Sequence, residues 1–371
     1  MKLSIFLIVI LLLLSTFASV LVHGLQVLPQ RPLIRWAFGS VYVLLFLSIF
    51  AGLFLEHTMS LWLAKAVTFS GYTFLVVVFC MLLSFLLTDV IRIINYYVHF
   101  APAGMMQFRQ WAAALSMVFI FGLLIVGNYR FNHPKVVELN LAVAHPTQNK
   151  QLRIVMASDI HLGTSIDKKR LHTYVQLINK QHPDIILLAG DVIDRSFGPV
   201  MEQRMEEELS LLKAPLGTFA ISGNHEYYSG VRQDIAEYLR KAGIVVLEDS
   251  TALINNSLYL IGRDDRTNRN RKSLKELVSN LTPGLPRILL DHQPYQLEEA
   301  STNGIDLQLS GHTHNGQIFP GNYIVRSMYE KGYGYLQKET THIYVSSGLG
   351  IWGPQYRIGS QSEIVVVNFS Y

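Results

Sequence analysis

The sequence predicts an α/β protein, with a layered β-sheet core and flanking helices, preceded by four transmembrane helices. The first part of the 371-residue chain holds four long stretches without Asp, Glu, Lys or Arg, and none recurs after residue 130. The rest alternates short apolar runs with helix-like patterns. Strands that are apolar throughout are typical of sheets covered by helices on their faces.

The four apolar stretches predict membrane spans, because each is long enough to cross a hydrocarbon core as a helix. They cover residues 3–22, 36–55, 66–88 and 111–129. Lys2 before the first stretch is typical of a signal peptide, but three further stretches make an uncleaved helix the simpler interpretation. The spans carry no charged residue at their centres, which favours an anchor over a transport path. We therefore assign residues 1–130 to a membrane domain, 131–149 to a linker and 150–371 to a second domain.

Charge and cysteine content exclude several classes of protein. The net charge of +4 comes from scattered Lys and Arg without a basic block, so no stable nucleic-acid partner is expected. The single cysteine, Cys80, lies within the third span, which excludes an intramolecular disulfide and a thiolate zinc site. Basic residues flank the spans equally on both sides. Giving short loops more weight places both termini, and hence the second domain, outside the cytoplasm.

The second domain shows the rhythm of a layered core. Short apolar or β-branched runs predict strands at 152–158, 184–190, 217–222, 252–262, 287–291, 305–310, 343–347 and 363–369. Helical spacing between several of these runs predicts helices at 167–181, 200–213, 231–242, 272–280 and 294–301.

Polar residues follow five of the predicted strands directly, in the motifs SDIH (158–161), GDVID (190–194), GNHE (223–226), LDHQP (290–294) and GHTH (311–314). Groups just beyond the carboxyl ends of such strands converge on one crevice. His312 and His314 are two residues apart, so on an extended backbone both would point toward one object. Carboxylate, amide and imidazole donors suit divalent Mn, Fe, Zn, Co or Ni. Seven such donors exceed the need of one ion and favour two ions that share a carboxylate.

In this order the motifs resemble the calcineurin-like metallophosphoesterase family. They read D-x-H at 159–161, G-D-x-x-D at 190–194, G-N-H-E at 223–226, a further His at 292 and G-H-x-H at 311–314. The closing segment SSGLGIWGPQYRIGSQSEIVVVNF is similar to the membrane-associated bacterial branch of that family. The resemblance covers nearly all of residues 150–371 and implies a metal-dependent phosphoric ester hydrolase. Asn315 is a departure, since that branch usually has Gly there.

The resemblance also implies a role for each site residue. Asp191 bridges two ions, of which the first is held by Asp159, His161 and His314, and the second by Asn224, His292 and His312. His225 is not a ligand but stabilises the transition state or protonates the leaving oxygen. Asp194, three residues beyond the bridging carboxylate, is expected to bond His225 and to favour its protonated form.

Further residues are candidates for supporting roles. Arg195 resembles an arginine that some phosphatases of the family use to grip phosphate, although Ser196 follows where those enzymes have Gly. Arg263 and Arg357 are alternative phosphate clamps. Glu226, Asp264 and Asp265 are candidates for hydrogen bonds around the ligands, whereas Tyr227 and Tyr228 are expected to pack.

The predicted reaction is hydrolysis of a phosphoester by a hydroxide that bridges the two ions, because cations lower the pKa of bound water. A phosphodiester of lipid or nucleotide type is the favoured substrate, and a membrane lipid is one candidate. A phosphomonoesterase or phosphoprotein phosphatase stays open, because the motifs bind the phosphoryl group common to all three. An inactive sensor module is disfavoured, because none of the seven ligands is missing.

Overall fold

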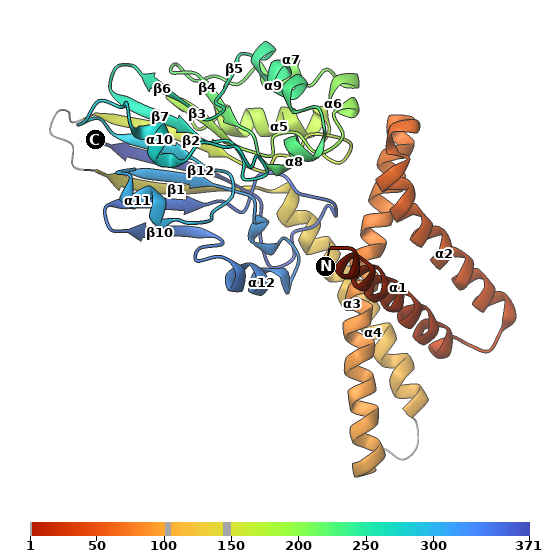
Figure 1. The fold of residues 1–371 in the computed structure, drawn as a ribbon. Helices are drawn as coiled ribbons and strands as arrows, with labels where there is room; N and C mark the ends of the chain where they lie inside the picture. The colour runs from red at the N-terminus through yellow and green to blue at the C-terminus, as the bar shows by residue number, and fades with distance from the viewer. Residues whose placement is uncertain (1, 101–104, 144–149) are drawn as a thin grey trace. The chain divides into compact units, whose positions relative to one another are not determined.

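The computed structural model describes residues 2–100, 105–143 and 150–371, and the chain divides into two compact units, Met1–Val126 and Gly127–Tyr371 (Figure 1). The described part of the first unit contains helices α1 (Lys2–Val27), α2 (Pro32–Phe54), α3 (Leu61–Val98) and the greater part of α4 (Met105–Asn132), with a 3-10 turn at Glu56–Thr58. All four helices are long and apolar enough to cross a membrane. They contain nearly all of the four predicted spans and extend beyond most of their ends.

Close contacts of small residues join two of these helices. A Cβ added to Gly71 of α3 would lie 2.9 Å from the backbone nitrogen of Ile49 in α2, so glycine permits a backbone approach typical of membrane helices. The charged side chain of Asp89 contacts His23 Nε2 at 2.8 Å and Arg92 Nη1 at 2.8 Å. These residues lie just beyond the predicted apolar stretches 3–22 and 66–88.

The second unit contains two six-stranded sheets in its described residues. The spatial order of the first is β1 (Lys135–Ala142), β12 (Glu363–Ser370), β2 (Gln151–Ala157), β3 (Ile185–Ala189), β4 (Thr218–Ile221) and β5 (Ile244–Val246). That of the second is β10 (Gly334–Lys338), β11 (Thr341–Val345), β9 (Leu307–Ser310), β8 (Arg287–Leu290), β7 (Leu258–Gly262) and β6 (Ser250–Ile254). Strands β2 to β5 are parallel, as are β7, β8, β9 and β11. The carboxyl ends of the parallel strands therefore meet at one edge of each sheet.

The two sheets pack on each other and helices cover their outer faces (Figure 1). In β2, Ile154 and Met156 belong to the core between the sheets, whereas Val155 and Ala157 pack beneath helices. This alternation follows the two-residue period of a strand. Helices α5 (Lys168–Asn179) and α9 (Arg232–Lys241) contribute to the core on the first sheet, and α10 (Leu274–Val278) and α11 (Glu298–Thr302) to that on the second. The layered α/β fold predicted from the sequence is confirmed.

The linker expected at 131–149 is corrected in its described part, because β1 lies there and pairs with β12 along its whole length. Its residues alternate between half-buried and exposed for most of the strand, so a search for continuous apolar runs passes over it.

The strand expected at 252–262 is a hairpin of β6 and β7, because Asn255 (φ 45°) and Asn256 (φ 51°) turn the chain. The helix expected at 200–213 divides into α6 (Gly198–Glu202) and α7 (Glu206–Leu209), with Arg204 at φ 50° between them.

Candidate metal centre

The seven predicted ligands lie just beyond strand ends of both sheets. In the first sheet Asp159 and His161 follow β2, Asp191 follows β3, and Asn224 begins α8 (Asn224–Tyr228) after β4. In the second sheet His292 follows β8, and His312 and His314 follow β9, with His314 in the 3-10 turn η2 (His314–Gly316). Six of these side chains are buried and His312 is half-buried.

Sharp backbone turns aim most of these side chains. Positive φ angles occur at Asp159 (53°), His161 (54°), Asp191 (50°), His312 (74°) and His314 (49°), a region that L-residues adopt rarely and mostly at functional sites. The expectation that the last two histidines lie on extended backbone is therefore wrong. They reach the site through a left-handed turn and serve different groups of side chains. Asn315 has φ 49° as well, and Asn tolerates this conformation better than most residues that replace Gly.

The ligand atoms form three overlapping groups, in each of which all atoms lie within 4.8 Å of one another. The first group is Asp159, His161 and His314; the second is His161, Asp191 and His225; the third is Asp191, His292 and His312. We call the first group cluster A and the third cluster B. Asn224 adjoins cluster B, since its Oδ1 lies 2.7 Å from His312 Nδ1. Asp191 thus lies in cluster B and shares the middle group with His161 of cluster A.

Hydrogen bonds hold the Asp191 carboxylate in one orientation. The backbone N–H of His225 donates to Asp191 Oδ1 at 2.8 Å, while Oδ2 lies 3.1 Å from His292 Nε2. The buried Glu226 carboxylate accepts from three backbone N–H groups, including that of Asp191 at 3.2 Å. Glu226 therefore supports the loop as expected. Burial and the neighbouring charge of Asp191 raise the pKa of Glu226 to about 7.

Several buried polar side-chain atoms have no hydrogen-bond partner in the described residues, among them Asp159 Oδ2, His161 Nδ1 and His314 Nδ1. Native proteins rarely leave buried polar atoms in this state, because it costs free energy. His161 Nε2 and His314 Nε2 also lie only 3.1 Å apart. A divalent cation would satisfy such a set of oxygen and nitrogen donors, so the residues fit a metal centre.

Burial and nearby charged groups shift the pKa values of the ligand histidines. Burial, His161 and Arg357 hold the pKa of His314 well below its usual value, which favours the neutral imidazole that binds metals. Burial also lowers the pKa of His312, to about 4. For His292 burial opposes protonation, but the carboxylate of Asp191 prevails and raises the pKa well above its usual value. A bound cation would have to displace that proton, which makes binding dependent on pH.

His225 and Asp194 are in contact, as the sequence suggested. His225 Nδ1 lies 2.6 Å from Asp194 Oδ1, and its ring stands edge-on to that of His161, with ring centres 4.5 Å apart. Burial would raise the pKa of Asp194, but the neighbouring imidazoles of His161, 3.7 Å away, and of the hydrogen-bonded His225 lower it, so the carboxylate stays ionised.

The three candidate phosphate clamps differ in their surroundings. Arg357 is fully buried and donates to the carbonyl oxygens of His314, Gly348 and Gly350, so it holds backbone and cannot grip a substrate. Arg263 is buried in ion pairs with Asp291 and Glu299, which corrects its assignment as well. Arg195 is exposed, and its guanidinium makes no hydrogen bond within the described residues. It alone of the three stays a predicted clamp.

Of the remaining candidates, Asp264 accepts from Tyr227 Oη and Asp265 from Gln293 Nε2, so within the described residues their side chains bond neighbours of the ligands in sequence and not the ligands themselves. Tyr227 packs as expected. Tyr228 does not, because it is 60% exposed. Trp352 was not foreseen: it is 51% exposed, and its ring centre lies 6.2 Å from that of His225. Its place in the glycine-rich segment after β11 is the signal that the sequence offered.

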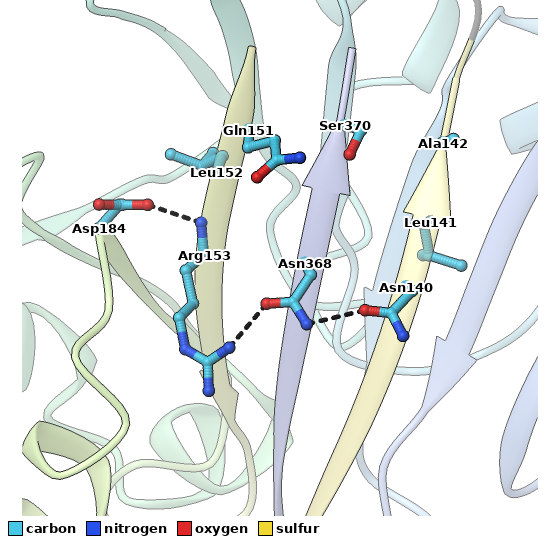
Figure 2. A pocket seen from close by; sticks show the side chains of 9 residues that line it. All are labelled: Asn140, Leu141, Ala142, Gln151, Leu152, Arg153, Asp184, Asn368 and Ser370. Carbon is cyan, nitrogen blue, oxygen red and sulfur yellow. Dashed lines mark hydrogen bonds between the residues drawn. The ribbon is translucent and has the colours of Figure 1, made fainter. Parts of the chain in front are cut away.

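A separate hollow of about 590 Å³ lies at the opposite end of β2, lined by polar side chains from the first sheet. Figure 2 shows Arg153 of β2, Asn368 of β12 and Asn140 of β1 in a row across three strands, joined by hydrogen bonds of 2.7 and 2.8 Å. The guanidinium of Arg153 is already hydrogen-bonded to Asn368, so it is not free to bind an anionic ligand. The hollow is thus distinct from the metal centre, and its polar row joins strands of the sheet.

Fold and site together define a class: an α/β protein with a metal centre of Asp, His and Asn at the ends of parallel strands. Residues 152–316 match the family model described as calcineurin-like phosphoesterase. Over 261 residues the chain is 33% identical to an uncharacterized metallophosphoesterase of Campylobacter jejuni, an alignment that covers 68% of each chain. The chain belongs to the metallophosphoesterase family.

Two further relatives extend the comparison. An uncharacterized metallophosphoesterase of Aquifex aeolicus is 34% identical over 58% of this chain and 84% of its own. A Danio rerio protein named transmembrane protein with metallophosphoesterase domain is 32% identical over 70% of this chain and 62% of its own. Together with the four candidate spans, the latter similarity indicates a membrane-associated chain.

Proposed function

We propose that this chain is a membrane-anchored phosphoesterase with two divalent ions, and that its substrate is a phosphodiester of lipid or nucleotide type. Residues 1–130 serve as membrane domain, and residues 150–371 together with strand β1 serve as catalytic domain, outside the cytoplasm. The observation that carries the proposal is the position of Asp191, within 4.8 Å of the ligand atoms of cluster B and of His161 in cluster A. A carboxylate so placed suits a bridge between neighbouring ions.

The ligand sets follow the clusters. Asp159, His161 and His314 would hold one ion, and His292 and His312 the other. Asn224 would join the second set through its position beside His312. When bound, the two ions supply Lewis acidity and lower the pKa of water.

Side chains of the chain itself are proposed to position the substrate and to protonate its leaving oxygen. His225 is buried, with 8% of its surface exposed, and Asp194 fixes its Nδ1 edge. With Nδ1 held by Asp194, the Nε2 edge of His225 is left to donate a hydrogen bond to the phosphoryl group or a proton to the leaving oxygen. Arg195, whose guanidinium is free in the described residues, is proposed to bind a phosphate oxygen.

The test is a turnover panel on the detergent-solubilised chain with added Mn²⁺. The panel holds a lipid phosphodiester, a nucleotide phosphodiester, a phosphomonoester and a phosphopeptide. We expect the diesters to be hydrolysed fastest, and the Asp191→Asn variant to hydrolyse none. Faster turnover of the monoester or the phosphopeptide would contradict the substrate assignment. No turnover by a metal-loaded chain would favour the inactive sensor instead.

A further inference from the structure

Helix α12 (Gly321–Met328) contains no buried residue, and its exposed positions include large apolar side chains. Tyr323 is 58%, Ile324 57% and Met328 61% exposed, and Phe319 just before the helix is 50% exposed. At helical spacing the three helix residues lie within one face. With Trp352, 51% exposed, they form what we call the apolar rim: Phe319, Tyr323, Ile324, Met328 and Trp352.

The apolar rim borders the metal centre. The turn η2, which contains His314, lies directly against the start of α12: a Cβ on Gly316 would lie 2.1 Å from the carbonyl carbon of Gly321. Just after η2, Gln317 Nε2 donates to the carbonyl oxygen of Trp352 at 2.8 Å. The ring of Trp352 in turn adjoins His225. A molecule that reaches His225 beside Trp352 therefore meets one member of the apolar rim directly.

The same region of the second unit contacts the last turns of α4, which belong to this unit. This unit begins at Gly127 and so includes the last turns of α4, residues 127–132. The carbonyl of Gly127 accepts from Arg357 N at 2.9 Å, and a Cβ on Gly127 would lie 2.9 Å from Ile358. The carbonyl of Ile358 in turn accepts from Phe319 N at 2.6 Å. Within the second unit, Ile358 thus contacts both Gly127 of α4 and Phe319 of the apolar rim.

We infer that the apolar rim inserts among the lipids of the membrane that holds the chain's own spans, and that the substrate is a lipid phosphoester drawn from that layer. Trp, Tyr and apolar side chains on one face of a short helix are typical of the membrane interface. Arg326, stacked 5.9 Å from the Tyr323 ring, adds a cation that suits anionic headgroups. The substrate class rests on the proposed function, whereas the insertion does not.

Insertion is tested directly with a fluorophore. In a Cys80→Ala background, which leaves no native cysteine, the full chain carries Ile324→Cys labelled with an environment-sensitive dye, in nanodiscs of phosphatidylcholine and phosphatidylglycerol. The matched control is Leu253→Cys, 46% exposed on β6, the strand of the second sheet farthest from β10 and α12. We expect spin-labelled lipid to quench the dye at position 324 and not at 253. Equal quenching at both positions, or quenching at neither, as when a second copy covers the rim, overturns the inference.

The substrate class is tested by comparing two substrates in the same nanodiscs, a lipid phosphodiester and soluble bis(p-nitrophenyl) phosphate. We expect the double variant Ile324→Glu, Met328→Glu to lower the ratio of lipid to soluble turnover by roughly tenfold, because charges are costly among lipids. Leu253→Glu should leave this ratio unchanged. An unchanged ratio in the double variant overturns the lipid assignment. If the parental chain hydrolyses neither substrate, the proposed function fails, and the quenching experiment still decides insertion.

Discussion

Arg357 offers the sharpest test of how the backbone supports the metal centre. Its guanidinium donates to the carbonyl oxygens of His314 at 2.8 Å, Gly348 at 3.1 Å and Gly350 at 2.6 Å. The N–H of Gly350 in turn donates to the carbonyl of Asp159 at 3.0 Å. Burial lowers the pKa of Arg357 to about 10, so the side chain stays charged at neutral pH. One cation therefore secures the backbone of two ligands of cluster A.

The perturbation is Arg357→Met, which keeps much of the volume and removes every donor. Three buried carbonyl groups lose charged hydrogen bonds, each worth about 1.5–3 kcal/mol. Part of this loss in stability is offset, because the folded protein no longer has to desolvate a buried cation. We expect the free energy of unfolding to fall by about 3 kcal/mol, and the metal affinity of cluster A to fall by roughly 10- to 100-fold, as for other groups that orient metal ligands. Arg357→Lys should recover part of both losses.

Metal affinity is measured by elemental analysis of the detergent-solubilised chain after equilibration with graded concentrations of a chelator. The free energy of unfolding is measured in urea, with susceptibility to proteolysis as the signal of unfolding. The matched control is Arg153→Met, which removes the bonds to Asn368 and to the carbonyl of Gln181 at the far end of the same domain. It should lower stability without loss of metal. The reasoning is refuted if Arg357→Met keeps both ions at parental affinity, or if the control loses metal to the same extent.

Three further predictions address the site itself. Asp191→Asn should lower metal occupancy at both clusters in elemental analysis, and two ions held at full affinity would disprove the bridge. His225→Ala should keep its metal yet lose turnover by roughly 10² to 10⁴, whereas loss of metal would make His225 a ligand. His314→Ala should empty the ion of cluster A and His312→Ala that of cluster B in metal titrations, both in folded protein. Two variants that unfold without losing metal would show a structural role for the pair.

The sequence predicted most of the fold because its strands are apolar throughout and its spans lack charge. It failed where local backbone decides the outcome. Two asparagines in left-handed conformation split one expected strand into β6 and β7. Strand β1, half exposed at a sheet edge, lacks the continuous apolar run that reveals a buried strand.

The sequence predicted which residues form the site, but not how deeply the residues around it are buried. Motifs at strand ends identified the residues that converge, because carboxylates and imidazoles are unlikely core material. Burial could not be read from them, and it is burial that removes Arg263 and Arg357 from the candidate clamps. Trp352 escaped notice for the converse reason, since a tryptophan is usually expected to pack and not to stand exposed beside His225.

Neither cluster is complete within one sheet. Cluster A takes Asp159 and His161 from the end of β2 in the first sheet and His314 from beyond β9 in the second. Cluster B takes Asp191 from the first sheet and its histidines from the second. The distances between ligands therefore depend on how the two sheets pack, through core residues that touch no ligand atom. Because a close-packed core transmits changes in volume, the apolar layer between the sheets is part of what sets the geometry of the metal centre.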